Sequence, residues 1–405
     1  MKIKDIKVFV CSPGRNFVTI KIITEEGVFG LGDATLNGRE MAVVAYLEEH
    51  IAPCLIGKDA SQIEDIWQYL YKGAYWRKGP VTMTAIGAID MALWDIKGKK
   101  ANMPVYQLLG GKSRKGVTVY GHANGETIDE VLNNLGRMID EGYKVVRLQC
   151  SVPNLKGTYG TMEGKKNYYE LQGNRPLPPE QQWSTPKYMN FIPELFKKAR
   201  ERFGYDIGLC HDVHSRLTPI EASRLGKLLE PYNLLFMEDT VTSENPQGYK
   251  IVREHTVVPL AVGEIFNTVW DAKILIENQW IDYLRTAVSH GGGITPLRKI
   301  SDFADMHHVR MAPHGAPDQS PICFMAQMNF NMWVPNFGIQ EFIGFGTQKL
   351  NEVFKYDVEI KKGLLYMEDK PGLGVEFNEV AAKKYPYKRS YLPVNRLEDG
   401  TLWNW

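Results

Sequence analysis

The stretches of sequence that decide the fold are IGLCHDVH (207–214), LLFMEDT (234–240) and PLAVGEIF (259–266). Each is a short apolar run that reaches an acidic residue, and these residues, Asp212, Glu238 and Glu264, lie at intervals of 26 residues. One parallel strand, one helix and their connections take roughly that many residues. The repeat therefore predicts consecutive βα units with an acid at the carboxyl end of each strand.

Acids at the carboxyl ends of consecutive parallel strands would meet on one rim of a barrel, where barrel enzymes keep their catalytic residues. Mg²⁺ prefers hard oxygen ligands and keeps positions open for a substrate. We therefore expect Asp212, Glu238 and Glu264 to bind one Mg²⁺ per subunit. The alternative is three unrelated strand-end acids, but the repeated interval favours a metal site.

Strand-like segments alternate with helix-length segments from residue 116 onward. They are GVTVYGHANG (116–125), YKVVRLQC (143–150), YDIGLCHDVH (205–214), LLFMEDT, PLAVGEIF, IDYLRTAVSH (281–290), HHVRMAPHG (307–315) and IQEFIG (339–344). This alternation favours a parallel sheet, and seven or eight units favour a closed, modified (β/α) TIM-type barrel, which we assign to residues 116–370.

The ends of the chain follow a different pattern. Residues 1–115 begin with two segments that read as antiparallel strands, IKDIKVFVC and FVTIKIITEEG, and continue with three helical stretches. They are typical of a separate α+β domain. Residues 371–405 carry aromatic side chains up to Trp405. We expect this C-terminal segment to pack back on the first domain.

An insertion interrupts the barrel at residues 151–186. It is rich in proline, glycine and tyrosine and has little periodicity. Long irregular stretches within a compact domain are uncommon and are often active-site lids. We expect a lid here, and the alternative is a surface insertion without a role.

The composition excludes several classes of protein. The 405 residues include 48 Lys and Arg against 47 Asp and Glu, which gives a net charge of +1 and favours neither nucleic acid nor an anionic membrane. Five scattered cysteines without a C-x-x-C motif indicate a reducing compartment. The N-terminus does not resemble a signal peptide, and no apolar run is long enough to span a membrane. We expect a cytoplasmic protein that acts on a small soluble molecule.

His214 lies two residues after Asp212. If both stood on one strand, their side chains would share a face. The imidazole and the metal-binding carboxylate would then point at the same bound molecule. Histidine is the natural general acid near neutral pH. The alternative is a structural histidine bonded to the backbone.

Arg147 and Tyr159 are candidates for a general base. A phenol with a pKa near about 10 is a poor base at neutral pH, but a neighbouring guanidinium favours the phenolate. Tyr159 lies in the predicted lid and Arg147 near the end of the preceding strand. The pair would work if the lid folds over the site, although a loop tyrosine usually serves only packing.

Further polar residues follow the later predicted strands. They are Arg285, His314, Asp318 and Glu341. A guanidinium pairs with anions, and polar groups on a Gly/Pro turn suit a polyhydroxylated ligand. Together they indicate a pocket for a sugar acid, although each is also compatible with a structural salt bridge.

Longer motifs resemble a known family. They include CSPGRNFVTIKI (11–22), GLGDATLNGRE (30–40), DMALWDIKGKKANMPVYQLLGG (90–111), WVPNFGIQEF (333–342) and YLPVNRLEDGTLWNW (391–405). Over essentially its full length the chain resembles the mannonate dehydratase group of the enolase superfamily, which includes D-galactonate dehydratase family members and the starvation-sensing RspA-type proteins. The resemblance implies an α+β N-terminal capping domain that the C-terminal tail completes, followed by a modified (β/α) barrel.

The resemblance also implies roles for individual residues. Tyr159, assisted by Arg147, would take the proton α to the substrate carboxylate, and His214 would protonate the departing 3-hydroxyl. Substrate contacts would come from Asn37, His122, Glu264, Arg285, His314, Asp318 and Glu341. The implied reaction converts D-mannonate, or possibly D-gluconate, to 2-keto-3-deoxy-D-gluconate through an enediolate. Members of the family form homo-oligomers, so a homo-oligomer is expected here.

The resemblance also links Ala316 to substrate specificity. Efficient members of the group resemble this chain at that position, whereas weak members often carry proline there. The long 151–186 insertion instead resembles the RspA-type branch, which includes weak enzymes. A catalytically silent member that binds a metabolite is therefore the alternative. Racemase or cycloisomerase chemistry is disfavoured, because Arg147 stands where those enzymes commonly have strand-borne lysines.

Overall fold

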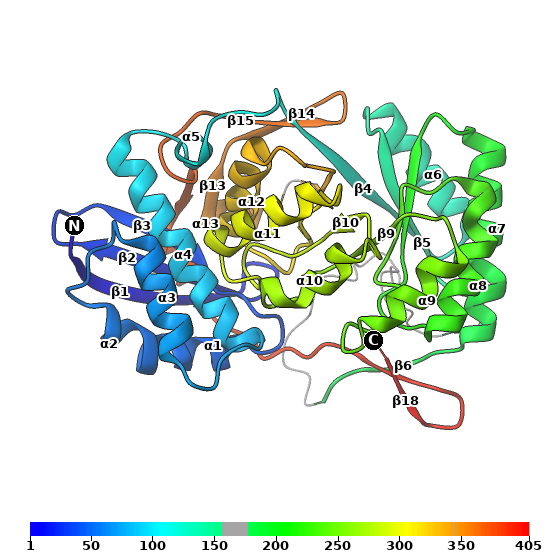
Figure 1. The fold of residues 1–405 in the computed structure, drawn as a ribbon, viewed down its shortest axis with the longest axis horizontal. Coiled ribbons are helices and arrows are strands. Elements are labelled where there is room, and N and C mark those ends of the chain that lie inside the picture. The colour runs from blue at the N-terminus through cyan, green and yellow to red at the C-terminus, as the bar shows by residue number, and fades with distance from the viewer. Residues whose placement is uncertain (156–176, 345, 405) are drawn as a thin grey trace.

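The computed structural model describes residues 1–155, 177–344 and 346–404. Within these residues, eight parallel strands form a barrel (Figure 1). The strands are β4 (Val117–Gly125), β5 (Val145–Cys150), β7 (Gly208–Asp212), β8 (Phe236–Glu238), β9 (Leu260–Val262), β10 (Tyr283–Leu284), β11 (Arg310–Met311) and β12 (Gln340–Glu341). β12 pairs with β4, and a parallel bridge from Met311 to Phe337 closes the ring. The predicted barrel is confirmed, including its eighth strand.

Helices follow the strands and surround the barrel. They are α6 (Ile128–Asp140), α7 (Thr185–Phe203), α8 (Pro219–Leu229), α9 (Gln247–His255), α10 (Val269–Glu277), α11 (Ile294–Met306) and α12 (Pro321–Trp333), with the short α13 (Gln348–Val353) after β12. Inside the barrel a separate buried cluster, which includes Tyr120, Phe236 and Tyr283, fills the space between the strands. The barrel is therefore a packed core, and chemistry is confined to its ends. No helix among the described residues is long and apolar enough to cross a membrane.

The N-terminal domain is α+β, as predicted. Its antiparallel sheet consists of β1 (Ile3–Cys11), β2 (Phe17–Thr24) and β3 (Phe29–Asp33). Its helices are α1 (Glu40–Tyr46), a π-helical turn (Leu47–Ile51), α2 (Ala52–Leu55), α3 (Ile63–Gly73), α4 (Pro80–Ala101) and α5 (Val105–Leu109). Gly30 and Gly32 let α4 approach β3 closely, because a Cβ on either would lie 2.0 Å from a carbonyl oxygen of α4.

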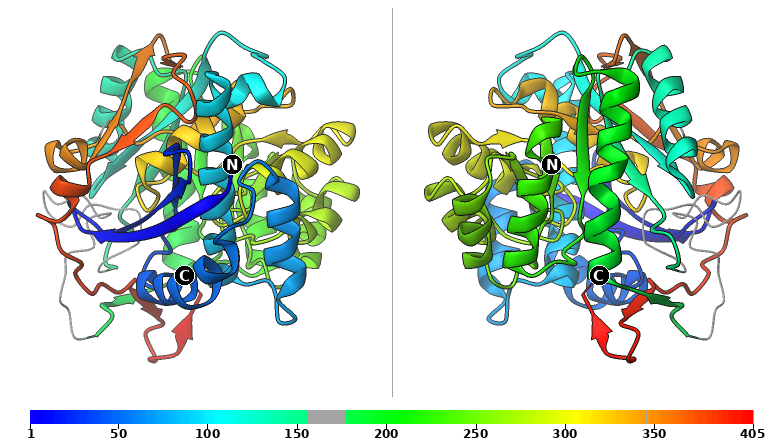
Figure 2. Two further views of the ribbon diagram at one scale, coloured as in Figure 1. Left: turned by 90° about the vertical axis from the view of Figure 1, so that its left-hand side faces the viewer. Right: turned by 90° about the vertical axis from the view of Figure 1, so that its right-hand side faces the viewer.

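The C-terminal segment touches both parts of the molecule. The Asn16 side chain donates to the Lys388 carbonyl over 2.7 Å, which ties the tail to the N-terminal domain. Further along, β17 (Val394–Arg396) pairs with β18 (Leu402–Trp403) and with β6 (Glu180–Gln182) of the barrel insertion. Figure 2 shows this hairpin at the lower edge of the molecule beside β6. We retain residues 371–405 as a proposed completion of the capping domain.

Part of the predicted lid, residues 156–176, lies outside the described residues. Within its remaining part, Glu180–Gln182 form β6, and α7 begins at Thr185. Short strands β13 (Phe354–Tyr356), β14 (Val358–Lys361), β15 (Leu364–Met367) and β16 (Val375–Phe377) and the helix α14 (Glu379–Ala382) link the barrel to the tail.

Buried aspartates of the N-terminal domain bind backbone amides of the barrel. Asp33 accepts from the Ser320 amide over 2.7 Å at the start of α12. Asp90 of α4 accepts from the Thr295 amide over 3.0 Å in the first turn of α11. The first amides of a helix have no partner within the helix, so an aspartate oxygen that accepts from one of them satisfies a buried donor. These contacts fix the N-terminal domain against the barrel.

We predict that Asp90 makes stability fall as pH rises. Burial raises the pKa of Asp90 to about 7, whereas an unfolded aspartate titrates near about 4. The folded state therefore binds the proton more tightly, and stability decreases between these two values. Asp90→Asn keeps a hydrogen-bond acceptor and carries no charge. The difference between its melting temperature and that of wild type should therefore rise from pH 5 to pH 8. The rise should correspond to roughly a few kcal/mol in the free energy of unfolding.

Thermal unfolding at several pH values measures this difference. Asp65→Asn on the exposed face of α3 provides the control and should show no such trend. A pH-independent difference between Asp90→Asn and wild type would contradict the prediction.

Candidate active site

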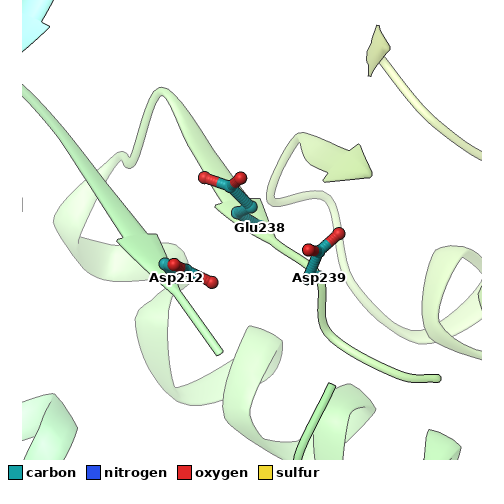
Figure 3. Close-up of side chains that lie close together, drawn as sticks. All are labelled: Asp212, Glu238 and Asp239. Carbon is teal, nitrogen blue, oxygen red and sulfur yellow. The ribbon is translucent and has the colours of Figure 1, made fainter. Parts of the chain in front are cut away.

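Three buried carboxylates gather at the carboxyl end of the barrel. Asp212 ends β7, Glu238 ends β8 and Asp239 follows directly, and one oxygen of each lies within 4.8 Å of the others (Figure 3). Asp212 and Glu238 are brought together by register, because they are paired residues of neighbouring parallel strands. We call these three residues the carboxylate cluster.

Glu264 does not belong to the cluster that the described residues form, although the sequence places it at the same interval. The reason is register. Glu238 pairs with Ala261 of β9, so Glu264 lies three residues further along the chain than the position beside Glu238, beyond the end of β9 at Val262. Equal spacing along the chain therefore does not give equal height in the barrel. Burial and the negative charges of Asp239 and Asp212 raise the pKa of Glu264 well above its usual range, which indicates that Glu264 still lies near the cluster.

Asp239 was missed in the sequence, although the signal was present in the dipeptide Glu238–Asp239. Burial and the Asp212 charge raise the pKa of Asp239 to about 7. Burial likewise raises the pKa of Glu238 well above its usual range. Glu238 Oε2 and Asp239 Oδ1 are buried without a hydrogen-bond partner among the described residues. Buried carboxylates that raise one another's pKa are the electrostatic setting in which a cation binds.

Two guanidinium groups beneath the rim offset part of this negative charge. Arg147 Nη1 donates to Asp212 Oδ2 over 2.7 Å. Arg285 Nε donates to Glu238, and Arg285 Nη2 donates to Glu341 Oε2 over 2.7 Å. Burial would raise the pKa of Asp212, but His214 and Arg147 outweigh it and hold that pKa below the usual range.

His122 completes this buried network. Its Nε2 lies 2.8 Å from Glu341 Oε1. Burial and the Arg147 charge lower the pKa of His122 to about 4, so the ring is neutral near pH 7 and its contact with Glu341 is a hydrogen bond. Arg285 keeps Glu341 ionised despite burial, by holding its pKa well below the usual range. The sequence anticipated these residues individually but not their mutual bonding.

His214 faces Asp212, but not for the predicted reason. β7 ends at Asp212, and His214 and Ser215 adopt left-handed backbone conformations with φ of 59° and 58°. The interpretation that strand periodicity aligns the two side chains is therefore wrong. A turn brings His214 Nε2 to 3.0 Å from Asp212 Oδ2, and Asp212 Oδ1 accepts from the His214 amide over 3.0 Å.

A cavity of about 880 Å³ opens above the carboxylate cluster. Of the residues singled out in the sequence, those that line it are Asn37, His214, Glu264, His314, Ala316 and Asp318. His122, Arg147, Arg285 and Glu341 are not among its described lining residues and lie in the buried network. Asp239, His290 and Trp403 also line the cavity and were not predicted as site residues. Tyr159 lies outside the described residues.

His314 links the cavity wall to the carboxylates. Its Nε2 lies 3.5 Å from Glu264 Oε2, 3.8 Å from Glu341 Oε2 and 4.0 Å from Asp318 Oδ1. Burial lowers the pKa of His314, which favours the neutral ring. A neutral imidazole can donate or accept, which suits contact with a hydroxyl group.

The site therefore combines a cation-attracting carboxylate cluster, an imidazole beside it and a cavity that several polar side chains line, with room for a small molecule. This arrangement suits proton transfer next to a carboxylate that a cation holds. It lies where barrel enzymes carry their active sites.

Comparison with family models identifies both domains. Residues 9–110 match the mandelate racemase / muconate lactonizing enzyme N-terminal domain, and residues 132–381 match the enolase C-terminal domain-like family. The carboxylate cluster and Glu264 fall within the second match.

Similar proteins cover the whole chain. A D-mannonate dehydratase of Caulobacter vibrioides is 58% identical over 405 residues, and a D-galactonate dehydratase family member RspA of Cellvibrio japonicus is 56% identical over 405 residues, with full coverage of both proteins in each case. The crystal structure of an enolase from Pantoea ananatis with bound D-gluconate and Mg is 40% identical, covers 99% of each chain and superimposes with a TM-score of 0.91. The chain therefore belongs to the enolase superfamily, within its D-galactonate and D-mannonate dehydratase family.

Proposed function

We propose that this protein is a Mg²⁺-dependent dehydratase that converts D-mannonate to 2-keto-3-deoxy-D-gluconate and water, with D-gluconate as a second candidate substrate. The observation that carries the proposal is the carboxylate cluster with His214 Nε2 at 3.0 Å from Asp212. The relatives named D-mannonate dehydratase and the structure with bound D-gluconate and Mg support the substrate class.

The residues present fit a divalent cation. The orphaned oxygens of Glu238 and Asp239 are buried acceptors that a cation would satisfy. We assign the ligands as Asp212, Glu238 and Glu264, because these three acids share one interval in the sequence. Burial and the charges of Asp239, Asp212 and Glu238 raise the pKa of Glu264 well above its usual range, which indicates that Glu264 lies near them. When bound, Mg²⁺ would supply fixed positive charge beside the substrate carboxylate and so favour loss of the α-proton.

The protein's own residues would move the protons. Tyr159, with its phenolate favoured by Arg147, would remove the proton at C2. His214 would give a proton to the 3-hydroxyl, which leaves as water, and the resulting enol would convert to the keto acid. The C2 proton and the C3 hydroxyl together account for the water lost.

The cavity residues would position the sugar chain. Asn37 from the N-terminal domain and His314 and Asp318 from the barrel all line the cavity. Ala316, between His314 and Asp318 in the sequence, has a small side chain and leaves space in the cavity at that point. This space would determine which hydroxyl configurations of the substrate fit. Arg285, Glu341 and His122 would act from the buried network below the cavity. They would set the charge state of Glu238 and the neighbouring carboxylates.

We predict that Glu264→Gln weakens Mg²⁺ binding far more than Asp239→Asn. Loss of a group that only orients a ligand costs about 10-fold to 100-fold in metal affinity, so loss of a ligand should exceed about 100-fold. Titration calorimetry of both variants measures this, with circular dichroism spectra of the metal-free variants that match the wild-type spectrum as the control. The opposite order would make Asp239 the third ligand.

His214→Asn should lower kcat by about 100-fold to 10,000-fold, the usual range for a lost general acid. Tyr159→Phe should cause a similar loss if it is the base. The measurement is product formation under saturating Mg²⁺, with His50→Asn on the exposed π-helical turn as the matched control. Substantial activity in both variants would refute the mechanism.

The substrate can be tested with a panel of hexonates and pentonates. We expect formation of a 2-keto-3-deoxy acid from D-mannonate, and slower formation from D-gluconate. Loss of activity after chelation and its return with Mg²⁺ would support metal dependence. Mg²⁺ binding without product from any acid would instead favour a binding role.

A further inference from the structure

We propose that Trp403, in the C-terminal β17–β18 hairpin, is a positioning residue that holds the turn carrying His214. The turn consists of residues 214–216, and Trp403 Nε1 donates to the Arg216 carbonyl over 2.8 Å. The inference rests on the proposed role of His214 as general acid, and it adds a residue 187 positions away from the turn.

The turn is conformationally costly. His214 and Ser215 are consecutive non-glycine residues with φ of 59° and 58°. Side chains in this region clash with the following backbone, so such residues persist only where surrounding contacts hold them. Without these contacts the turn would relax and move the imidazole.

Three hydrogen bonds between residues that the structure describes hold the turn in place. Asp212 Oδ1 accepts from the His214 amide over 3.0 Å, and the Asp239 carbonyl accepts from the Ser215 amide over 2.6 Å. The third is the bond from Trp403 to Arg216. Of these three bonds, the first two come from the carboxylate cluster itself, and the third comes from outside it.

The hairpin is anchored well enough to serve this purpose. β17 pairs with β6, and the Arg396 carbonyl accepts from the Trp183 amide over 2.8 Å. The Arg216 guanidinium carbon lies 5.0 Å from the Trp183 ring centre. Trp183 therefore contacts the side chain of Arg216, and Trp403 of the hairpin binds its carbonyl. Arg216 is 1% exposed.

Trp403 also lines the same cavity as His214 and Ser215. The indole thus connects the outer wall of the cavity to the residue that would protonate the leaving hydroxyl. A displaced acid slows elimination, because misplacement by about 1 Å can cost about 100-fold in rate. Removal of the α-proton, which uses other residues, should be affected less.

The test is Trp403→Phe, which removes the indole N–H and keeps an aromatic ring. Mg²⁺-loaded protein is assayed with D-mannonate in D₂O for product formation and for deuterium at C2 of the recovered substrate. We expect kcat to fall about tenfold with KM within about twofold. Deuterium in recovered substrate should rise relative to product, because the carbanion is reprotonated more often than it loses the hydroxyl.

Trp270→Phe is the matched control, because Trp270 lies on the surface of α10 and is 59% exposed. It should leave kcat, KM and the deuterium ratio unchanged. An unchanged kcat in Trp403→Phe would overturn the proposal. A raised KM with an intact kcat would also overturn it, because Trp403 would then act by contact with the substrate.

A second measurement separates this inference from the proposed function. Hydrogen exchange should show faster exchange of the Ser215 amide in Trp403→Phe, with the amides of β5 unchanged. If wild-type protein converts no acid sugar, the proposed function fails, and the exchange result still decides the positioning role. Unchanged protection at Ser215 would refute that role.

Discussion

The burial of negative charge at the carboxyl end of the barrel constrains the rest of this structure. Asp212 and Glu238 stand side by side because β7 and β8 pair in register, and Asp239 adds a third carboxylate within 4.8 Å. Isolated charges of this kind are expensive to bury, so they require compensation by paired cations and hydrogen bonds. Arg147 and Arg285 provide part of that compensation from beneath. The negative charge that these two arginines do not neutralise is the electrostatic basis for a metal site.

The cavity above this charge is formed by segments far apart in the sequence. Asn37 comes from the N-terminal domain, His314 from the seventh barrel strand's loop and Trp403 from the tail. Buried carboxylates such as Asp33 and Asp90 lock the N-terminal domain to helix starts of the barrel. The same interactions that stabilise the junction therefore also set the walls of the cavity.

The fold was largely predictable because its signals are local. Each barrel strand is a short apolar run followed by a helix-length segment, and the short-range pattern is the same whether or not the barrel closes. The acids Asp212 and Glu238, and the imidazole of His214, were identifiable because they follow such runs directly. Asp239, His290 and Trp403 were not predicted, since a residue that reaches a site from a loop or a distant hairpin has no periodic signal.

The sequence by itself determined the chemical inventory of the site and the order of its strands, since both depend on residue identity and local periodicity. Only the tertiary structure decided which groups meet. Interstrand register placed Glu238 beside Ala261 and left Glu264 three residues beyond it. A left-handed turn, not strand alternation, directed His214 toward Asp212. Register and turn conformation depend on contacts between segments that are remote in the chain. The spacing of residues in the sequence does not indicate these contacts.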